Sequence, residues 1–169
     1  MLTLQKASAG SGKTYALTRH FIHFLIGIKP EGAKSYRLRT DDEMLDGIRR
    51  ILAITFTNKA TNEMQMRIID KLDDLANYNG GPDKPDYMDY FTKEFGVPSA
   101  KISEIAGTAL KMLLNNYSDF NVSTIDSFFQ LVLRTLAYEC GVMDAYQVEL
   151  ESNYVSRMGL NLSLIHISE

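Results

Sequence analysis

A cluster of small residues followed by a lysine and a threonine stands near the start of the chain. Residues 7–14 read ASAGSGKT, and the last five fit the end of the phosphate-binding pattern G-x-x-x-x-G-K-[ST]. Glycines let backbone N–H groups turn towards an anion, and the N-terminus of a following helix adds its dipole. Lys13 is expected to contact the β and γ phosphates of a nucleotide, and the Thr14 hydroxyl is expected to bind Mg²⁺.

All positions of this loop are therefore candidate nucleotide contacts: Ala7, Ser8, Ala9, Gly10, Ser11, Gly12, Lys13 and Thr14. Ala7 occupies the first position, where the pattern has glycine. The alternative interpretation is a flexible glycine turn with a surface lysine. The loop alone does not choose between functions, because kinases, GTPases and helicases share it.

A second group of polar residues follows the apolar run ILAITF. Thr55, Phe56, Thr57, Asn58 and Lys59 come at the end of a predicted strand and lead into a predicted helix. Ligands bind at the carboxyl ends of parallel strands, so hydroxyl, aromatic, amide and cationic groups would be presented together. Single-stranded nucleic acid is bound by such a mixture. The alternative is that Thr57 or Asn58 caps the helix and Phe56 lies in the core.

A third stretch, NVSTIDSFFQLVLRTL (residues 121–136), has the same arrangement of a strand running into a helix. Thr124 and Ser127 are placed to hold a phosphate at the helix start, whereas the charge of Asp126 opposes it. Ser127 to Gln130 also fits a capping box, in which serine and glutamine satisfy free backbone donors. The alternative is a capped helix with a phenylalanine-rich core face.

The elements that must position these residues alternate between strand and helix. Strands are predicted at 2–5, 50–56 and 120–124, and helices at 13–26, 60–78 and 127–138, the last ended by Gly141. Residues 29–46 are polar and predict a surface excursion, and NGGPDKP (79–85) predicts a break. Residues 86–117 are again helical, with Pro98 and Gly107 as interruptions. The alternation predicts an α/β domain with a mainly parallel sheet.

The composition narrows the class of protein. A net charge of −3 argues against a generally basic nucleic-acid coat but permits a local basic groove. The single cysteine, Cys140, cannot form an internal disulfide, which favours the reducing cytoplasm. The apolar segment FIHFLIG is too short to span a membrane, so no membrane partner is expected. The histidines His20 and His23 and the acidic run at 41–43 lack metal-ligand spacing and predict surface or core positions.

The three stretches together, in this order, resemble motifs I, Ia and Ib of the UvrD/RecB-type superfamily 1 DNA helicases. The ASAGSGKT opening and the long gap before TIDSFF are more similar to the RecB/AddA branch, and the resemblance covers about residues 1–150. It implies a P-loop NTPase fold, here a partial RecA-like α/β domain with a parallel sheet and helical insertions. It also implies ATP and Mg²⁺ as cofactors.

The resemblance assigns roles to individual residues. Lys13 and Thr14 would hold ATP and Mg²⁺ as the catalytic pair, and Tyr15 would pack on the adenine. The track along single-stranded DNA would be formed by Thr55, Phe56, Thr57, Asn58 and Lys59 and continued by Thr124 and Ser127. Asp126 stands where the family commonly has histidine.

The resemblance also implies a domain organisation. Residues 1–142 would be the N-terminal part of the first RecA-like domain, with a helical insertion at about 79–117. Residues 143–162 would begin an accessory subdomain, and 163–169 resemble a non-native, adaptor-derived tail. The chain would then be the N-terminal fragment of its parent protein, inactive alone because it lacks an Asp-Glu pair of the Walker B type.

The implied parent is an ATP-dependent 3′-to-5′ DNA helicase or helicase–nuclease acting in repair or recombination. Its partners would be single-stranded DNA and DNA ends, with room for a second helicase–nuclease subunit. Two other functions stay open from the sequence. One is a P-loop nucleotide or small-molecule kinase, for which Arg37, Arg39, Arg49 and Arg50 would be available. The other is a non-catalytic nucleic-acid-binding module.

Overall fold

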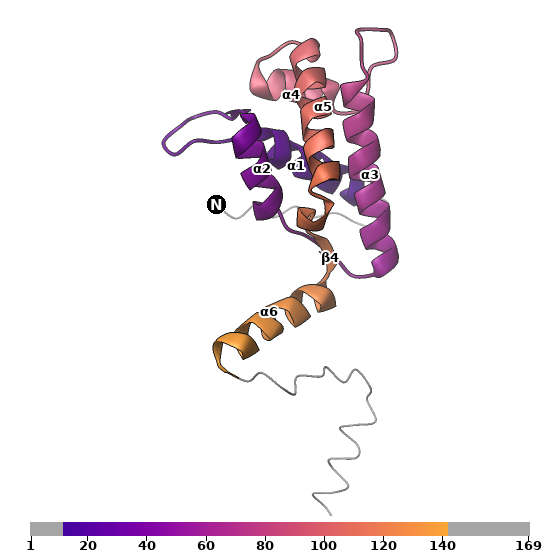
Figure 1. Ribbon diagram of the computed structural model, residues 1–169. Helices are drawn as coiled ribbons and strands as arrows, with labels where there is room; N and C mark the ends of the chain where they lie inside the picture. Colours follow the sequence, from indigo (N-terminus) through magenta and orange to yellow (C-terminus); the bar gives the residue numbers. More distant parts are fainter. Residues whose placement is uncertain (1–11, 142–169) are drawn as a thin grey trace, which may run out of the picture. The chain divides into compact units, whose positions relative to one another are not determined.

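In the computed structural model, which describes residues 12–141, the helices are long and the strands are short (Figure 1). The helices are α1 (Lys13–Ile26), α2 (Asp41–Arg50), α3 (Asn58–Ala76), α4 (Met88–Phe95), α5 (Ser99–Asn115) and α6 (Ile125–Glu139), with a 3-10 turn, η1, at Tyr117–Asp119. The strands are β1 (Gly27–Ile28), β2 (Arg37–Leu38), β3 (Ala53–Thr55) and β4 (Val122–Thr124). The strand predicted at 2–5 and all residues after 141 lie outside the described residues.

The parallel pair β3–β4 confirms the pairing expected from the strand–helix alternation. Ala53 pairs with Val122, Ile54 with Ser123 and Thr55 with Thr124. The prediction of a continuous buried strand over 50–56 is partly wrong. Helix α2 runs to Arg50, only three residues form β3, and Ile54 is 42% exposed. The other pair, β1–β2, is antiparallel.

Helix α2 corrects the prediction that residues 29–46 are only a surface excursion, because that segment also contains β2 and the start of α2. The helix begins with a capping box. The Glu43 N–H donates to the Thr40 hydroxyl at 3.4 Å, and the Thr40 N–H donates to the Glu43 carboxylate at 3.0 Å. Met44 and Ile48, one turn apart, are buried in the core. A polar sequence thus forms a helix with one narrow apolar stripe.

The core is formed mainly by α1, α3 and α5, and α3 and α5 pack along each other (Figure 1). The bounds predicted for α1 are confirmed, and its side chains Ile22, Leu25 and Ile26 are fully buried. In α3, which confirms the helix predicted at 60–78, the apolar residues that recur at helical spacing are buried: Met64, Ile68, Leu72 and Leu75. Full burial of such a side chain is worth about 1.5–3 kcal/mol, so these helices supply most of the apolar stabilisation.

The region 86–117 contains two helices separated by a turn. Pro98 precedes α5 at its N-cap position, as an interruption should. Gly107, in contrast, lies inside α5 and does not interrupt it. A Cβ atom at Gly107 would lie 3.7 Å from the Ala76 Cβ of α3, so two small residues face each other where the helices pack. The predicted break at 79–85 is confirmed as a segment without helix or strand.

The chain divides into two units, residues 1–125 and 126–169, and nearly all of α6 belongs to the second. The capping-box prediction for Ser127 is wrong, because α6 begins at Ile125 and Ser127 lies within its first turn. Gly141 follows α6 with a φ of +73°, a conformation that suits glycine at a helix end. No residue of α6 is buried. None of the helices within residues 12–141 is both long and apolar enough to cross a membrane.

Candidate functional site

The N-terminus of α1 begins at a glycine in a left-handed conformation. Gly12 stands at its N-cap with a φ of +76°, a left-handed conformation that glycine adopts without steric cost. Among the described residues, no side-chain hydrogen bond caps α1, α4 or α5, whereas Thr40 caps α2 and Thr57 caps α3. The first N–H groups of a helix have no acceptor within the helix, and an anion can satisfy them. This end of α1 therefore fits a phosphate.

Lys13, Thr14 and Tyr15 form the first turn of α1, and all three are exposed. Their position behind a left-handed glycine is the one that the phosphate-loop pattern requires. The remaining candidate positions of the loop, residues 7–11, lie outside the described residues. The structure thus describes the cationic, hydroxyl and aromatic members of the predicted nucleotide site.

Tyr15 is held by a residue that the sequence reasoning did not single out. The ring of Tyr87 lies 4.5 Å from the ring of Tyr15, centroid to centroid, with 55° between their planes. The Tyr87 hydroxyl also donates to the Tyr15 carbonyl oxygen at 2.9 Å. Tyr87 precedes α4 and is 72 positions along the chain from Tyr15. No local sequence signal marks such a contact.

The ends of β3 and β4 lie side by side, because the strands are parallel and Thr55 pairs with Thr124. Thr55 of the second polar group and Thr124 of the third are thereby brought to one edge of the sheet. The Thr55 hydroxyl is 2.6 Å from the Thr61 hydroxyl, which ties the strand end to α3. Thr124 is only 7% exposed, so little of its side chain is presented to a ligand.

Phe56 is the most exposed large apolar residue in the described chain, at 87%. The alternative that placed Phe56 in the core is therefore wrong, but the part of that alternative in which Thr57 caps the helix is confirmed. Thr57 is the N-cap of α3, and its hydroxyl accepts from the Ala60 N–H at 3.1 Å. An aromatic ring left in solvent at a strand tip is available for stacking.

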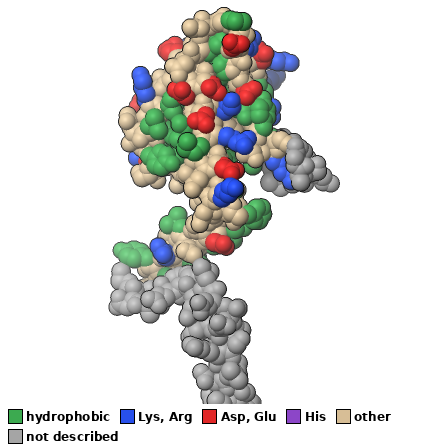
Figure 2. All heavy atoms as spheres, turned by 90° about the vertical axis from the view of Figure 1, so that its right-hand side faces the viewer, with side chains coloured by type: hydrophobic (Ala, Val, Ile, Leu, Met, Phe, Trp, Pro, Cys, Tyr) green, Lys and Arg blue, Asp and Glu red, His purple; other side chains and the backbone are tan. Residues whose placement is uncertain are grey.

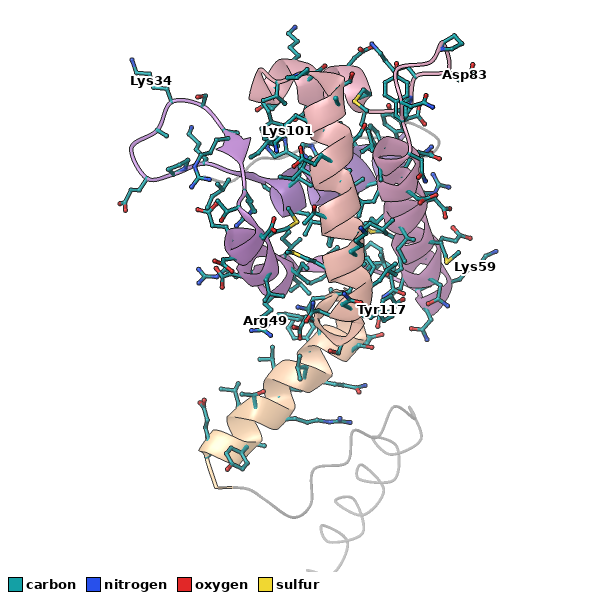
Figure 3. All side chains as sticks on the ribbon, turned by 45° about the horizontal axis from the view of Figure 1, so that its top comes forward. Lys34, Arg49, Lys59, Asp83, Lys101 and Tyr117 are labelled. Carbon is teal, nitrogen blue, oxygen red and sulfur yellow. The ribbon has the colours of Figure 1, made fainter. Side chains whose placement is uncertain are left out.

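Asn58 and Lys59 are exposed in the first turn of α3. Lys59 projects outwards from that end of the helix (Figure 3). No ion pair within residues 12–141 neutralises Lys59. Ser127 is also exposed, in the first turn of α6 in the second unit.

Charge on the molecule is mixed and does not form a broad basic surface on the face shown in Figure 2, where acidic and basic side chains are interspersed. The four arginines that would be available for the lid of a kinase already have partners within the fold. Their partners are Glu43 for Arg37, the Phe24, Gly27 and Glu43 carbonyls for Arg39, Asp119 for Arg49 and Asp46 for Arg50. This arrangement does not favour the kinase alternative.

His23 lies in the core, which is one of the two environments, surface or core, that the sequence predicts for it. It is buried among aromatic rings, and its Nδ1 lies 3.1 Å from the Tyr90 hydroxyl. Burial lowers the pKa of His23. The acidic run at 41–43 forms the first turn of α2. The part of the chain that the structure describes contains no group of three or more acidic, histidine or cysteine side chains arranged for a metal.

Comparison with known proteins identifies relatives along almost the whole chain. A family model described as the UvrD/REP helicase N-terminal domain matches residues 3–164. The chain is 27% identical over 135 residues to the RecBCD enzyme subunit RecB of Buchnera aphidicola, covering 79% of this chain and 10% of that protein. It is 27% identical over 145 residues to a probable DNA helicase II homolog of Mycoplasma genitalium, covering 75% and 18%.

The chain is also 26% identical over 152 residues to the ATP-dependent DNA helicase UvrD1 of Mycobacterium tuberculosis, covering 90% of this chain and 16% of that helicase. No solved structure matches the chain significantly. The chain thus spans between 10% and 18% of the length of these three curated relatives.

Proposed function

Because the chain belongs to the UvrD/REP helicase N-terminal domain family, we propose that it is the ATP-binding N-terminal portion of a longer ATP-dependent DNA helicase. The longer protein would move 3′-to-5′ on single-stranded DNA, as a helicase or helicase–nuclease in repair or recombination. Residues 1–142 would belong to the first RecA-like domain, with a helical insertion at about 79–117, and residues 143–162 would begin an accessory subdomain.

One observation supports this function above others: the parallel register of β3 with β4. It sets Thr55 beside Thr124, and Phe56, the residue after Thr55, is exposed to solvent. A base can stack on an exposed ring, while hydroxyl, amide and ammonium groups contact the phosphates. The proposed DNA track consists of Thr55, Phe56, Thr57, Asn58, Lys59, Thr124 and Ser127. The burial of Thr124 makes it the least accessible member in the first unit.

The proposed nucleotide site is the N-terminal end of α1. Lys13 would contact the β and γ phosphates, Thr14 would bind Mg²⁺, and the backbone from Gly12 would approach the phosphates without a side chain in the way. The fit rests on the left-handed Gly12, the uncapped helix start and the exposure of Lys13 and Thr14. Bound ATP would supply the free energy for movement on DNA.

The proposed partners follow from the relatives' names and from composition. One relative is a subunit of the RecBCD enzyme, which supports a second helicase–nuclease subunit as a partner of the longer protein. Single-stranded DNA or DNA ends would be the substrate. The single cysteine, Cys140, which is free and exposed, supports a reducing cytoplasm as the compartment.

Replacement of Phe56 tests the DNA track. Because Phe56 is exposed, Phe56→Ala should leave thermal stability nearly unchanged, yet it should weaken binding of a labelled oligothymidylate by about 1–3 kcal/mol, the usual value of one stacked base. Fluorescence anisotropy of the 169-residue chain at low salt measures this affinity. The matched control is Met66→Ala, which also removes an exposed apolar side chain but at a position within α3. Equal affinities of the two variants for DNA would contradict the track.

A further inference from the structure

Tyr15 occupies the position at which the proposed nucleotide site meets the rest of the fold. It follows Lys13 and Thr14 directly in the first turn of α1, and 45% of its surface is exposed. An aromatic side chain placed so near a phosphate site is suited to stack on the base of the same nucleotide. Such stacking is stronger when the ring is held in place before the ligand arrives, because less side-chain entropy is lost on binding.

Tyr87 provides that hold through two separate contacts. Its ring packs against the Tyr15 ring at 4.5 Å, and its hydroxyl donates to the Tyr15 carbonyl at 2.9 Å. Tyr87 itself is only 6% exposed. Burial raises the pKa of Tyr87 to about 12, so the hydroxyl keeps the proton that it donates.

The backbone at Tyr87 is in an unusual conformation for a tyrosine. Its φ is +70°, and no other residue besides glycines has a positive φ within residues 12–141. A bulky side chain is disfavoured there, so the surroundings must hold it. Its ring contacts Phe91 of α4, with centroids 6.2 Å apart, and the preceding residue, Asp86, pairs with Lys71 of α3 at 3.1 Å. Contacts with two helices, α3 and α4, therefore fix Tyr87 against Tyr15 of α1.

We infer that Tyr87 is a positioning residue, which holds the Tyr15 ring as a stacking surface for the nucleobase of the bound nucleotide. The inference rests on the proposed function, since it needs a nucleotide at the start of α1. It adds a residue from the helical segment after the 79–85 break to the nucleotide site. Phosphate affinity would come from the start of α1, and base affinity would depend on the Tyr15–Tyr87 pair.

Two ligands separate these contributions: Mg·ATP, which has a base, and Mg·tripolyphosphate, which has none. In the 169-residue chain, Tyr87→Leu should weaken ATP binding by about threefold to tenfold, the range expected for loss of an aromatic pair, and leave tripolyphosphate binding unchanged. Tyr87→Phe keeps the ring and removes the hydroxyl, and should cause a smaller loss in the same direction. Isothermal titration calorimetry at high protein concentration measures both affinities.

A matched control and a double variant make the test specific. Tyr90→Phe removes the hydroxyl of another tyrosine, in α4, whose partner is His23 of α1. It should leave the ratio of ATP to tripolyphosphate affinity unchanged. In a Tyr15→Ala background, Tyr87→Leu should cause no further loss of ATP affinity, because the ring that it positions is gone.

Several results would overturn the inference. One is that Tyr87→Leu weakens the binding of both ligands equally. Another is that Tyr87→Leu weakens ATP binding by the same factor in the Tyr15→Ala background as in the unchanged chain. A third is that the unchanged chain binds the two ligands with equal affinity. If circular dichroism shows Tyr87→Leu to be unfolded, Tyr87→Phe decides, and an unchanged affinity ratio in that variant overturns the inference. Absence of binding of both ligands to the unchanged chain would instead reject the proposed nucleotide site itself, and the inference with it.

Discussion

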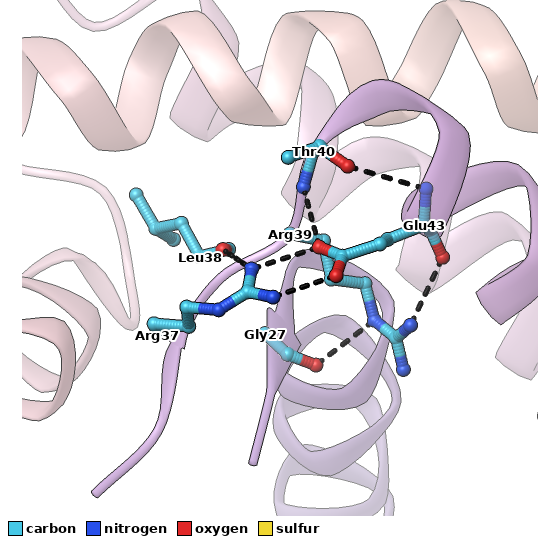
Figure 4. Close-up of polar contacts among 6 residues, drawn as sticks. All are labelled: Gly27, Arg37, Leu38, Arg39, Thr40 and Glu43. Carbon is cyan, nitrogen blue, oxygen red and sulfur yellow. Dashed lines mark hydrogen bonds and ion pairs between the residues drawn. The ribbon is translucent and has the colours of Figure 1, made fainter. Parts of the chain in front are cut away.

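At the scale of single residues, Glu43 shows how one carboxylate organises a segment that lacks a large core (Figure 4). The Arg37 guanidinium donates to its two oxygens at 2.6 and 2.8 Å, and the Thr40 N–H donates at 3.0 Å. These hydrogen bonds lower the pKa of Glu43 from its ordinary value of 4.5 to about 2, and the hydrogen bonding from Arg37 has the largest effect. The charged form of Glu43 is therefore the one that the fold favours.

A dependence of stability on pH follows from this lowered pKa. Since the pKa is lower in the folded chain, Glu43 stabilises the fold fully above pH 4.5, and this contribution is lost as the pH falls towards about 2. Glu43→Gln should thus lower the thermal midpoint at pH 7, and its difference from the unchanged chain should shrink between pH 4.5 and 2. Thermal unfolding followed by circular dichroism measures this, with Glu104→Gln, which removes a surface pair with Lys101, as the control. A difference that stays constant down to pH 2 would contradict the assignment.

At the scale of elements, Arg39 joins the end of α1 to α2. Its Nε donates to the carbonyls of Phe24 and Gly27 at 3.1 and 3.0 Å, and its Nη1 donates to the Glu43 carbonyl at 2.9 Å. Orphan carbonyls at a helix C-terminus are thereby satisfied. Gly47 of α2 makes room for this guanidinium, because a Cβ atom there would lie 3.0 Å from the Arg39 Cζ.

The two helical glycines Gly47 and Gly107 should respond in opposite ways to alanine. Alanine in a helix interior is favoured over glycine by about 0.5–1 kcal/mol. Gly107→Ala should gain roughly that amount, since its new Cβ would meet the Ala76 Cβ at an ordinary 3.7 Å. Gly47→Ala should lower stability, because the displaced Arg39 loses hydrogen bonds to α1 and α2. Urea unfolding of both variants measures the difference, and a similar gain in both would show that Arg39 moves without cost.

The sequence was sufficient for elements that bury a long apolar stripe. The sequence predicts α3, which buries four apolar residues at helical spacing, and it predicts the bounds of α1 correctly. Helix α2 was missed because only Met44 and Ile48 supply its apolar stripe, although the spacing of Thr40 and Glu43 was a readable start signal. Helix propensity alone predicts an interruption at Gly107, because it ignores packing against a neighbouring helix.

The candidate site was predictable where it depends on order along the chain and less so where it depends on distant contacts. The pairing of β3 with β4 could be expected from strand–helix alternation, and it is present. The exposure of Phe56 could not be expected from the sequence, because core and surface positions at a strand end have the same sequence pattern. The contact of Tyr87 with Tyr15 joins segments 72 residues apart and has no local pattern.

At the scale of the whole molecule, binding of a nucleotide and its hydrolysis require different parts. Hydrolysis needs a carboxylate that holds Mg²⁺ and orients water, and cations that stabilise the transition state. The sequence contains one adjacent Asp-Glu pair, Asp42-Glu43. It lies in the first turn of α2, and Glu43 is already engaged by Arg37. Neither β3 nor β4 is followed by such a pair, since Phe56 and Ile125 come next.

We therefore expect the 169-residue chain to bind Mg·ATP without appreciable turnover. Phosphate release should not exceed that of Lys13→Ala, with or without single-stranded DNA, because the missing step is hydrolysis and not binding. Calorimetry on the same samples should detect ATP binding by the unchanged chain and not by Lys13→Ala, since the lysine charge is needed at the β and γ phosphates. A turnover that is stimulated by DNA and lost in Lys13→Ala would contradict this expectation. It would mean that residues 1–169 hold a complete hydrolytic site, with its carboxylate supplied by a position other than Asp42-Glu43.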